Sequence, residues 1–126
     1  MGWLEAELFK IHMRELQATQ SILTKALLKA RESNAKRITT VHLAIGELAE
    51  LDQGSIQGHW TEISKGTPAE QSRIHFRLIP AEVQCMACFQ EYKPIGGKIH
   101  CPYCGSYGAK VLTGEEFYLE SIEWDE

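Results

Sequence analysis

The chain has 126 residues, of which 44% are hydrophobic, and its formal net charge of −4 corresponds to a pI near 5.7. This length suits one domain, or one domain with a small insert, and nucleic-acid-binding proteins usually show a basic surplus that this chain lacks. No apolar run reaches the ~20 residues of a membrane helix, and residues 1–12 make a poor signal peptide, so we expect a cytoplasmic protein with reduced thiols.

The first predicted helix covers residues 15–33. Its apolar stripe consists of Leu16, Leu23, Leu27 and Ala30. Ser33 and Asn34 form a stop signal after basic residues in the last turn. Residues 1–12 stand before a second methionine, Met13, and are predicted to be a tag or an engineered leader ahead of a natural start there.

A strand, a second helix and a second strand are expected next. Residues 37–46 alternate as a strand, and residues 73–79 do the same before Pro80. Between them, Asp52 is placed to cap a helix. The inward positions predicted for the three elements are Val41, Leu43 and Ile45; Ile56, Trp60 and Ile63; and Ile74, Phe76 and Leu78.

Residues 84–110 differ in composition, with all four cysteines and few aliphatic residues, and strand character returns at residues 116–124. The order helix, strand, helix, strand, insert, strand predicts an α+β fold. Two helices would pack on a small mixed sheet formed by residues 13–83 and 111–126, and residues 84–110 would form an inserted zinc-ribbon subdomain.

The cysteines form two Cys-x-x-Cys pairs separated by twelve residues. Two residues between thiolates allow a tight turn to direct both sulfurs at one ion, and two such turns complete a tetrahedral shell with no open position. We therefore predict a structural zinc site. Its ligands would be Cys85, Cys88, Cys101 and Cys104.

Two other uses of these cysteines are less favoured. A redox Cys-x-x-Cys belongs at a helix start in a thioredoxin-like unit, which the pattern lacks. An iron–sulfur cluster also takes four thiolates, but paired turns beside Gly and Pro suit zinc better. His100 adjoins Cys101 and could replace a ligand, although a solvated histidine is the simpler interpretation.

Several motifs around the cysteines resemble the HypA/HybF hydrogenase nickel-incorporation family. The segments that carry the resemblance are 13–23, Ile45-Gly46-Glu47-Leu48, Ile79-Pro80-Ala81-Glu82 before Cys85, Gly114-Glu115-Glu116-Phe117 and Ser121-Ile122-Glu123. The resemblance covers residues 13–123. It implies a metallochaperone, not an enzyme, that helps deliver nickel to the large-subunit precursor of nickel–iron hydrogenase. It also implies a partner, the nickel-handling GTPase of the same maturation pathway.

In that family, nickel binds at an N-terminal Met-His-Glu sequence through the amine, backbone amides and imidazole, a nitrogen set that suits square-planar nickel. Here Glu15 matches, but Arg14 occupies the histidine position and stays protonated. His12 is a candidate substitute imidazole, or a linker residue. Asp52 matches a position that the family links to nickel, or is simply a helix cap.

The remaining features favour binding over catalysis. His42, His59 and His75 have no partner at ligand spacing in the sequence and are interpreted as surface or half-buried residues. No catalytic arrangement of Ser, His, Asp or Cys is legible. The alternative function is a zinc-ribbon module that binds nucleic acid or protein, but Lys93, Lys98 and Lys110 give only a mild basic surplus.

Overall fold

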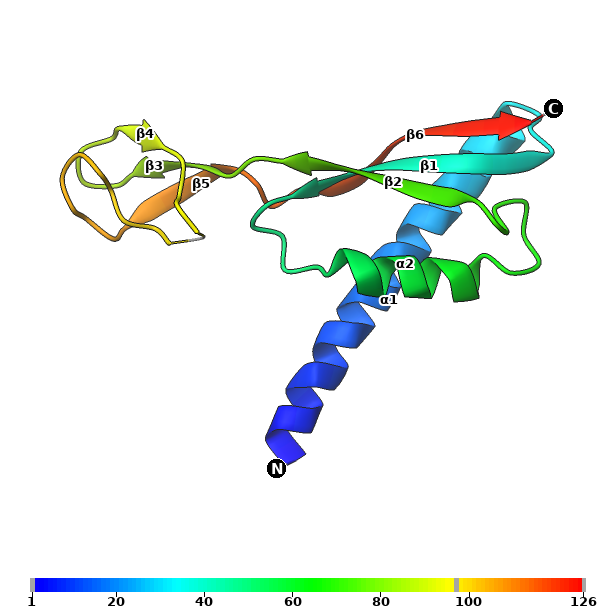
Figure 1. Ribbon diagram of the computed structural model, residues 1–126, viewed down its shortest axis with the longest axis horizontal. Coiled ribbons are helices and arrows are strands. Elements are labelled where there is room, and N and C mark those ends of the chain that lie inside the picture. The colour runs from blue at the N-terminus through cyan, green and yellow to red at the C-terminus, as the bar shows by residue number, and fades with distance from the viewer. Residues whose placement is uncertain (1, 97, 126) are drawn as a thin grey trace. The chain divides into compact units, whose positions relative to one another are not determined.

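The computed structural model describes residues 2–96 and 98–125, and it describes side chains from residue 14 onward within those ranges (Figure 1). The helices are α1 (Gly2–Glu32) and α2 (Gln53–Ile63). The strands are β1 (Arg37–Gly46), β2 (Arg73–Ile79), β3 (Glu82–Cys85), β4 (Glu91–Tyr92), β5 (Ala109–Thr113) and β6 (Phe117–Asp125). Two helices with two small sheets confirm the predicted α+β class.

Helix α1 begins at Gly2, well before the predicted start at residue 15. The sequence has no proline or glycine between Gly2 and the end of the helix, so no helix-breaking residue interrupts the backbone hydrogen bonds. The predicted stop is confirmed. Asn34 is left-handed (φ 56°), and the Ala35 N–H donates to the Ala30 carbonyl at 2.8 Å, which closes the last turn as in a Schellman motif.

The buried face of α1 is rotated relative to the predicted stripe. The buried positions are Glu15, Thr19, Ile22, Ala26 and Ala30. The predicted residues Leu16, Leu23 and Leu27 are half-buried and flank this face. The prediction counted apolar residues only, whereas small and polar side chains at i and i+4 form the face here because they permit close packing. The two polar members have hydrogen-bond partners.

The first sheet has the strand order β2-β1-β6, so β6 rejoins it after the cysteine-bearing segment, as predicted. Val41, Leu43 and Ile45 on the central strand are buried, which confirms their predicted orientation. The prediction that Leu78 faces inward is wrong, because this residue is 54% exposed. It lies beyond the part of β2 that groups with the helices.

Helix α2 is capped at its N-terminus and buried along one face. Asp52 caps it as predicted, since its carboxylate accepts the Ser55 N–H at 2.8 Å. Ile56 and Trp60 are buried, and the helix packs against α1 (Figure 1). The Trp60 indole N–H donates to the Ser72 hydroxyl at 2.8 Å, so this large side chain is buried with its polar atom satisfied.

The second sheet is antiparallel, with the order β4-β3-β5. Val83 is opposite Tyr92 on one side and Val111 on the other. These strands were not predicted, because they have four, two and five residues and pair across the cysteine turns. An antiparallel bridge joins Ile95 and Lys98 on either side of the turn that contains Gly96, and Gly97 lies outside the described residues.

The chain divides into two compact units. The first comprises residues 1–43, 51–76 and 119–126, and the second comprises residues 44–50 and 77–118. Inside the second unit, the Gly46 N–H donates to the Glu116 carbonyl at 2.7 Å, and the Leu48 N–H donates to the Gly114 carbonyl at 2.6 Å. The functional boundaries 13–83, 111–126 and 84–110 stay a prediction.

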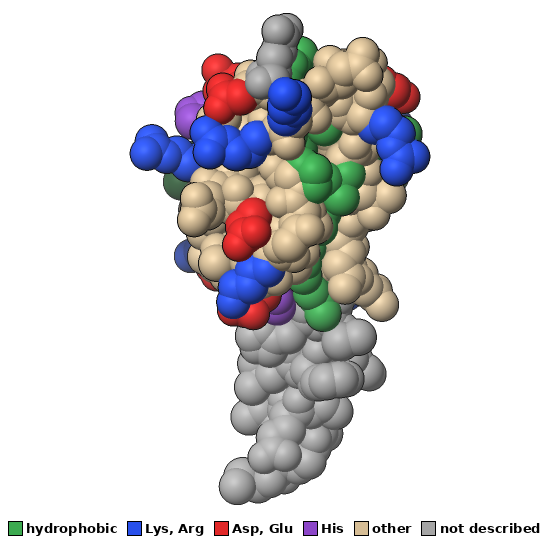
Figure 2. Space-filling model, turned by 90° about the vertical axis from the view of Figure 1, so that its right-hand side faces the viewer, with side chains coloured by type: hydrophobic (Ala, Val, Ile, Leu, Met, Phe, Trp, Pro, Cys, Tyr) green, Lys and Arg blue, Asp and Glu red, His purple; other side chains and the backbone are tan. Residues whose placement is uncertain are grey.

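The structure can be compared with two classes of protein that the sequence disfavours, membrane-spanning proteins and nucleic-acid-binding proteins. Among the described residues, no helix is long and apolar enough to cross a membrane. On the face drawn in Figure 2, lysine and arginine side chains are interspersed with acidic ones. This face therefore has no continuous basic tract of the kind that follows a nucleic-acid backbone.

Candidate metal centre

Two turns of the same design carry the cysteines. Cys85 ends β3, and the Phe89 N–H donates to its carbonyl at 3.0 Å; the Gly105 N–H donates in the same way to the Cys101 carbonyl at 2.9 Å. The residue after the second cysteine is left-handed in both turns, with φ 64° at Phe89 and 78° at Gly105. Each turn thus brings its two sulfurs to one side of the loop.

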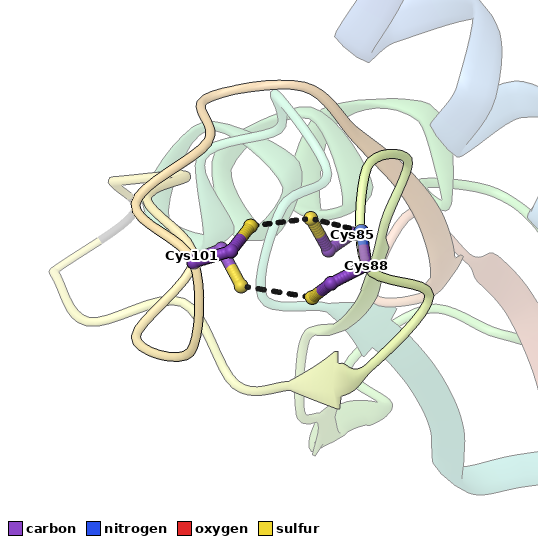
Figure 3. A group of neighbouring side chains, drawn as sticks. Cys85, Cys88 and Cys101 are labelled. Atoms are coloured by element: carbon purple, nitrogen blue, oxygen red, sulfur yellow. Dashed lines mark hydrogen bonds between the residues drawn. The ribbon is translucent and has the colours of Figure 1, made fainter.

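The four sulfurs meet between the two turns (Figure 3). The sulfurs of Cys85 and Cys104 are 3.5 Å apart, those of Cys88 and Cys101 are 3.6 Å apart, and all four lie within 4.8 Å of one another. Zinc bound tetrahedrally, with Zn–S bonds of about 2.3 Å, holds its sulfurs about 3.8 Å apart. Disulfides would require about 2.05 Å, so this spacing fits a closed metal shell.

Backbone N–H groups already favour the thiolate form at two positions. The Cys88 N–H donates to the Cys85 sulfur at 3.4 Å and is the main reason that the pKa of Cys85 falls to about 6. Burial raises the pKa of Cys101, but the N–H groups of Cys104 and Tyr103 outweigh it, so the net pKa is lowered. One thiol in each turn therefore has a pKa below that of a free cysteine before any ion binds.

The other two thiols resist ionisation. The Ser106 N–H lowers the pKa of Cys104, but the Cys85 sulfur and burial outweigh it and raise this pKa to about 12. At Cys88 the Gln90 N–H also lowers the pKa, and burial with the neighbouring sulfurs raises it overall. All four sulfurs can therefore be thiolates only beside a cation, and binding a divalent ion would release the remaining protons.

The core of the second sheet is too small to be stable alone. Its buried members are Val83, Cys85, Tyr92 and Cys101, with Cys88, Ile99, Ala109 and Val111 packed around them. Three of these residues, Cys85, Cys88 and Cys101, are also sulfur donors, so ligands of the metal site form part of this core. A core of this size normally needs an additional cross-link, which a structural metal such as zinc would provide.

Phe89 offers a test of the turn design. A left-handed backbone costs a non-glycine residue about 1 kcal/mol, and the Phe89 side chain is 69% exposed, so it recovers little by packing. Phe89→Gly is expected to raise the free energy of unfolding by about 1 kcal/mol in urea. Gly105→Ala is the reciprocal control and should lower it by a similar amount, while zinc content stays unchanged in both variants.

Two of the predicted nickel residues, Glu15 and Asp52, lie where α1 meets the start of α2. Glu15 is 2% exposed, and its carboxylate accepts the Asp52 N–H at 2.7 Å. Asp52 is exposed and caps α2, as its structural interpretation predicted. Arg14 is exposed, and the His12 side chain lies outside the described residues. The structure thus brings Glu15 and Asp52 together through a backbone hydrogen bond.

Glu15→Ala should show how much this hydrogen bond stabilises the first unit. The change leaves the Asp52 N–H without its acceptor and removes a buried side chain, so we expect a loss of about 2–3 kcal/mol in urea unfolding. Glu15→Gln keeps an acceptor oxygen of the same shape and should cost about 1 kcal/mol or less. Equal losses in both variants would show that the carboxylate charge, not the acceptor, matters.

His42 is half-buried and His75 is exposed, as predicted, but the fold gives them neighbours that sequence spacing did not reveal. His42 has a partner, because its Nε2 lies 3.1 Å from a Glu123 carboxylate oxygen, and the His75 ring lies edge-on to it at a centroid distance of 5.2 Å. The His42 contact, helped by the Thr40 hydroxyl, holds the pKa of Glu123 below its ordinary value. Sequence spacing could not reveal this group because its members come from three strands.

The other two described histidines stand apart. His59 is half-buried, as predicted, and its Nε2 is buried with no hydrogen-bond partner within the described part of the chain. His100 is exposed and stacks on Tyr107 at a ring-centroid distance of 4.8 Å. Among the described residues, the four cysteines form the group whose ligand atoms are already gathered for a metal ion.

The sequence model of the family described as hydrogenase/urease nickel incorporation, metallochaperone, hypA matches residues 13–124. Hydrogenase maturation factor HypA of Dehalococcoides mccartyi is 34% identical over 90% of this chain and 96% of its own length. HypA of Aquifex aeolicus is 31% identical over 88% of this chain and 96% of its own length. The solution structure of the Ni metallochaperone HypA from Helicobacter pylori matches with TM-score 0.62 at 20% identity, covering 87% of this chain and 96% of that one. Together with the cysteine cluster, these similarities show that the chain belongs to the HypA family of nickel metallochaperones for hydrogenase maturation.

Proposed function

We propose that this protein delivers nickel to the large-subunit precursor of nickel–iron hydrogenase in the cytoplasm. The observation that carries the proposal is the family match, which spans residues 13–124 and therefore both compact units. The role is one of carrying and handing over an ion, and no enzyme activity is proposed. The nickel-handling GTPase of the maturation pathway would be the partner in transfer.

Zinc is the proposed occupant of the four-cysteine cluster. The donor set is all sulfur, the sulfur spacing suits tetrahedral coordination, and no position is left for a substrate. When bound, zinc would neutralise the charge of four thiolates and would cross-link the two turns through coordinate bonds. Cys85, Cys88, Cys101 and Cys104 would hold it. Nickel passing through the protein would bind elsewhere.

Glu15, His12 and Asp52 are the proposed contacts for nickel near the start of the family match. The helix continues unbroken through Met13, whose nitrogen belongs to a peptide bond. The free amine of the family's N-terminal site is thus replaced by a peptide bond at Met13. Because Arg14 adds no donor, this set has one imidazole and two carboxylates.

The surface of the cysteine-bearing turns supports protein binding over nucleic-acid binding. Phe89, Tyr103 and Tyr107 are exposed by 69%, 65% and 76%, and Met86 in the first turn is exposed by 65%. Exposed aromatic and methionine side chains are enriched where proteins meet. We propose that the GTPase contacts this surface. Titration with single-stranded DNA at low salt should show no binding, and tight binding would favour the nucleic-acid module instead.

Complementation tests the proposed function. A bacterium that lacks its own HypA should regain hydrogenase activity and nickel in its large subunit when it expresses this chain. Chains with Cys101→Ser and with Met86→Ala separate the cluster from the surrounding surface. The first should fail to restore nickel insertion, and the second should retain the zinc site. Absence of nickel from the large subunit, despite soluble expression of the unchanged protein, would overturn the proposal.

A further inference from the structure

A group of imidazole and carboxylate side chains lies on the first sheet, away from the cysteines. His42 is on the central strand β1, with β2 carrying His75 on one side and β6 carrying Glu123 on the other. All three residues belong to the first compact unit. The neighbours Val41, Ile122 and Ile74 are buried or half-buried, so the three polar side chains occupy the opposite, solvent-facing side of the sheet.

Two of these side chains, those of His42 and Glu123, already have the spacing of ligands around one ion. His42 Nε2 and a Glu123 oxygen are 3.1 Å apart. Two donors about 2.1 Å from a metal, at right angles, are about 3 Å apart. The His75 ring centroid is 5.2 Å from that of His42, and the exposed His75 side chain can rotate to direct a nitrogen at the same point.

The surroundings of the group carry both signs of charge. His42 and Thr40 hold the pKa of Glu123 below its ordinary value. The His42 and Glu123 side chains are 31% and 63% exposed, which leaves open coordination positions for water or a receiving protein. Arg73 and Arg77 each stand two residues from His75, about 7 Å of strand to either side, and Arg37 is paired with Asp125 at 2.8 Å.

We propose that His42, His75 and Glu123 form a second, exchangeable binding site for Ni²⁺ on the first sheet. Imidazole with carboxylate suits divalent ions such as nickel, and an incomplete three-ligand shell releases an ion more readily than a closed four-thiolate shell. The choice of nickel rests on the proposed function. The site has two imidazoles, one more than the set of His12, Glu15 and Asp52 can provide.

Nickel titration of the zinc-loaded full chain tests the site, with calorimetry for affinity and imidazole NMR signals for location. The His42 and His75 ring signals should be perturbed before that of His59. The double variant His42→Gln/His75→Gln should weaken nickel binding at this site at least tenfold, and Glu123→Gln should weaken it severalfold. His59→Gln is the matched control, and urea unfolding of each variant checks that the sheet is intact.

Unchanged affinity in the double variant, or ring signals that respond only above millimolar nickel, would overturn the inference. A variant of the other set, His12→Gln/Glu15→Gln/Asp52→Asn, should leave the His42 and His75 signals responsive. Hydrogenase complementation separates the two proposals. If nickel binds at these histidines but the unchanged chain fails to load the hydrogenase, only the proposed function fails; if loading succeeds without binding here, only this inference fails.

Discussion

Replacing Cys101 with serine should reduce the zinc content from about one to below about 0.1 ion per chain after dialysis against a chelator, and should unfold the second unit. Zinc binding to thiolate sites contributes on the order of 10 kcal/mol, and this free energy is also folding free energy. Cys101 is 1% exposed and belongs to the small core that surrounds the sulfurs. The first unit has its own core and should persist.

Elemental analysis and amide NMR spectra together measure this outcome. Signals from residues 77–118 should collapse to the unfolded region, while those from residues 14–43 and 51–76 keep their dispersion. Met86→Ala is the matched control, since Met86 lies inside a Cys-x-x-Cys pair and is 65% exposed. A Cys101→Ser chain that retains stoichiometric zinc and a folded second unit would contradict the assignment of the four ligands.

Gly46→Ala is expected to lower the free energy of unfolding by about 3 kcal/mol or more. A Cβ added at Gly46 would lie 2.0 Å from the Gly114 carbonyl oxygen and 2.7 Å from the Glu115 nitrogen, and backbone cannot yield as a side chain can. The shift would also disrupt the hydrogen bonds that the Gly46 and Leu48 N–H groups donate there. The damage should fall on the second unit.

Urea unfolding of the zinc-loaded protein measures this effect, and Gly58→Ala provides the control. A Cβ added at Gly58, inside α2, has no neighbour within 4 Å. Alanine at that position should raise the free energy of unfolding by about 0.5–1 kcal/mol, because it restricts the unfolded chain. If both alanine variants changed stability by the same amount, crowding at Gly46 could not be the cause.

The sequence predicted what depends on local spacing. The two Cys-x-x-Cys pairs, the cap at Asp52 and the stop at Asn34 are encoded within a few residues, and the structure places each as expected. The α+β class and the return of the last strand followed from the order of periodic segments. The family resemblance added the function, which spacing alone could not have identified.

The sequence-based predictions fail where contacts between residues far apart in the chain determine the structure. Glu15 belongs to the buried face of α1 because its carboxylate meets the Asp52 N–H, 37 residues away. The contact between His42 and Glu123 joins residues 81 positions apart. Strands such as β4, with two residues, have no periodicity to detect and exist because β3 pairs with them.

Trp60 and Tyr92 give the two units separate optical reporters. The tryptophans of the chain are Trp3, Trp60 and Trp124, and none belongs to the second unit, which instead contains Tyr92. Trp60 is 1% exposed and bonded to Ser72, so exposing its indole to water should shift its emission to longer wavelength. The buried Tyr92 hydroxyl has no hydrogen-bond partner among the residues that the structure describes, and it lies among the thiols, so the ultraviolet absorbance of Tyr92 should follow the metal-bearing unit. One sample, monitored at two wavelengths during chelation, would thus show whether the units lose structure together or in sequence.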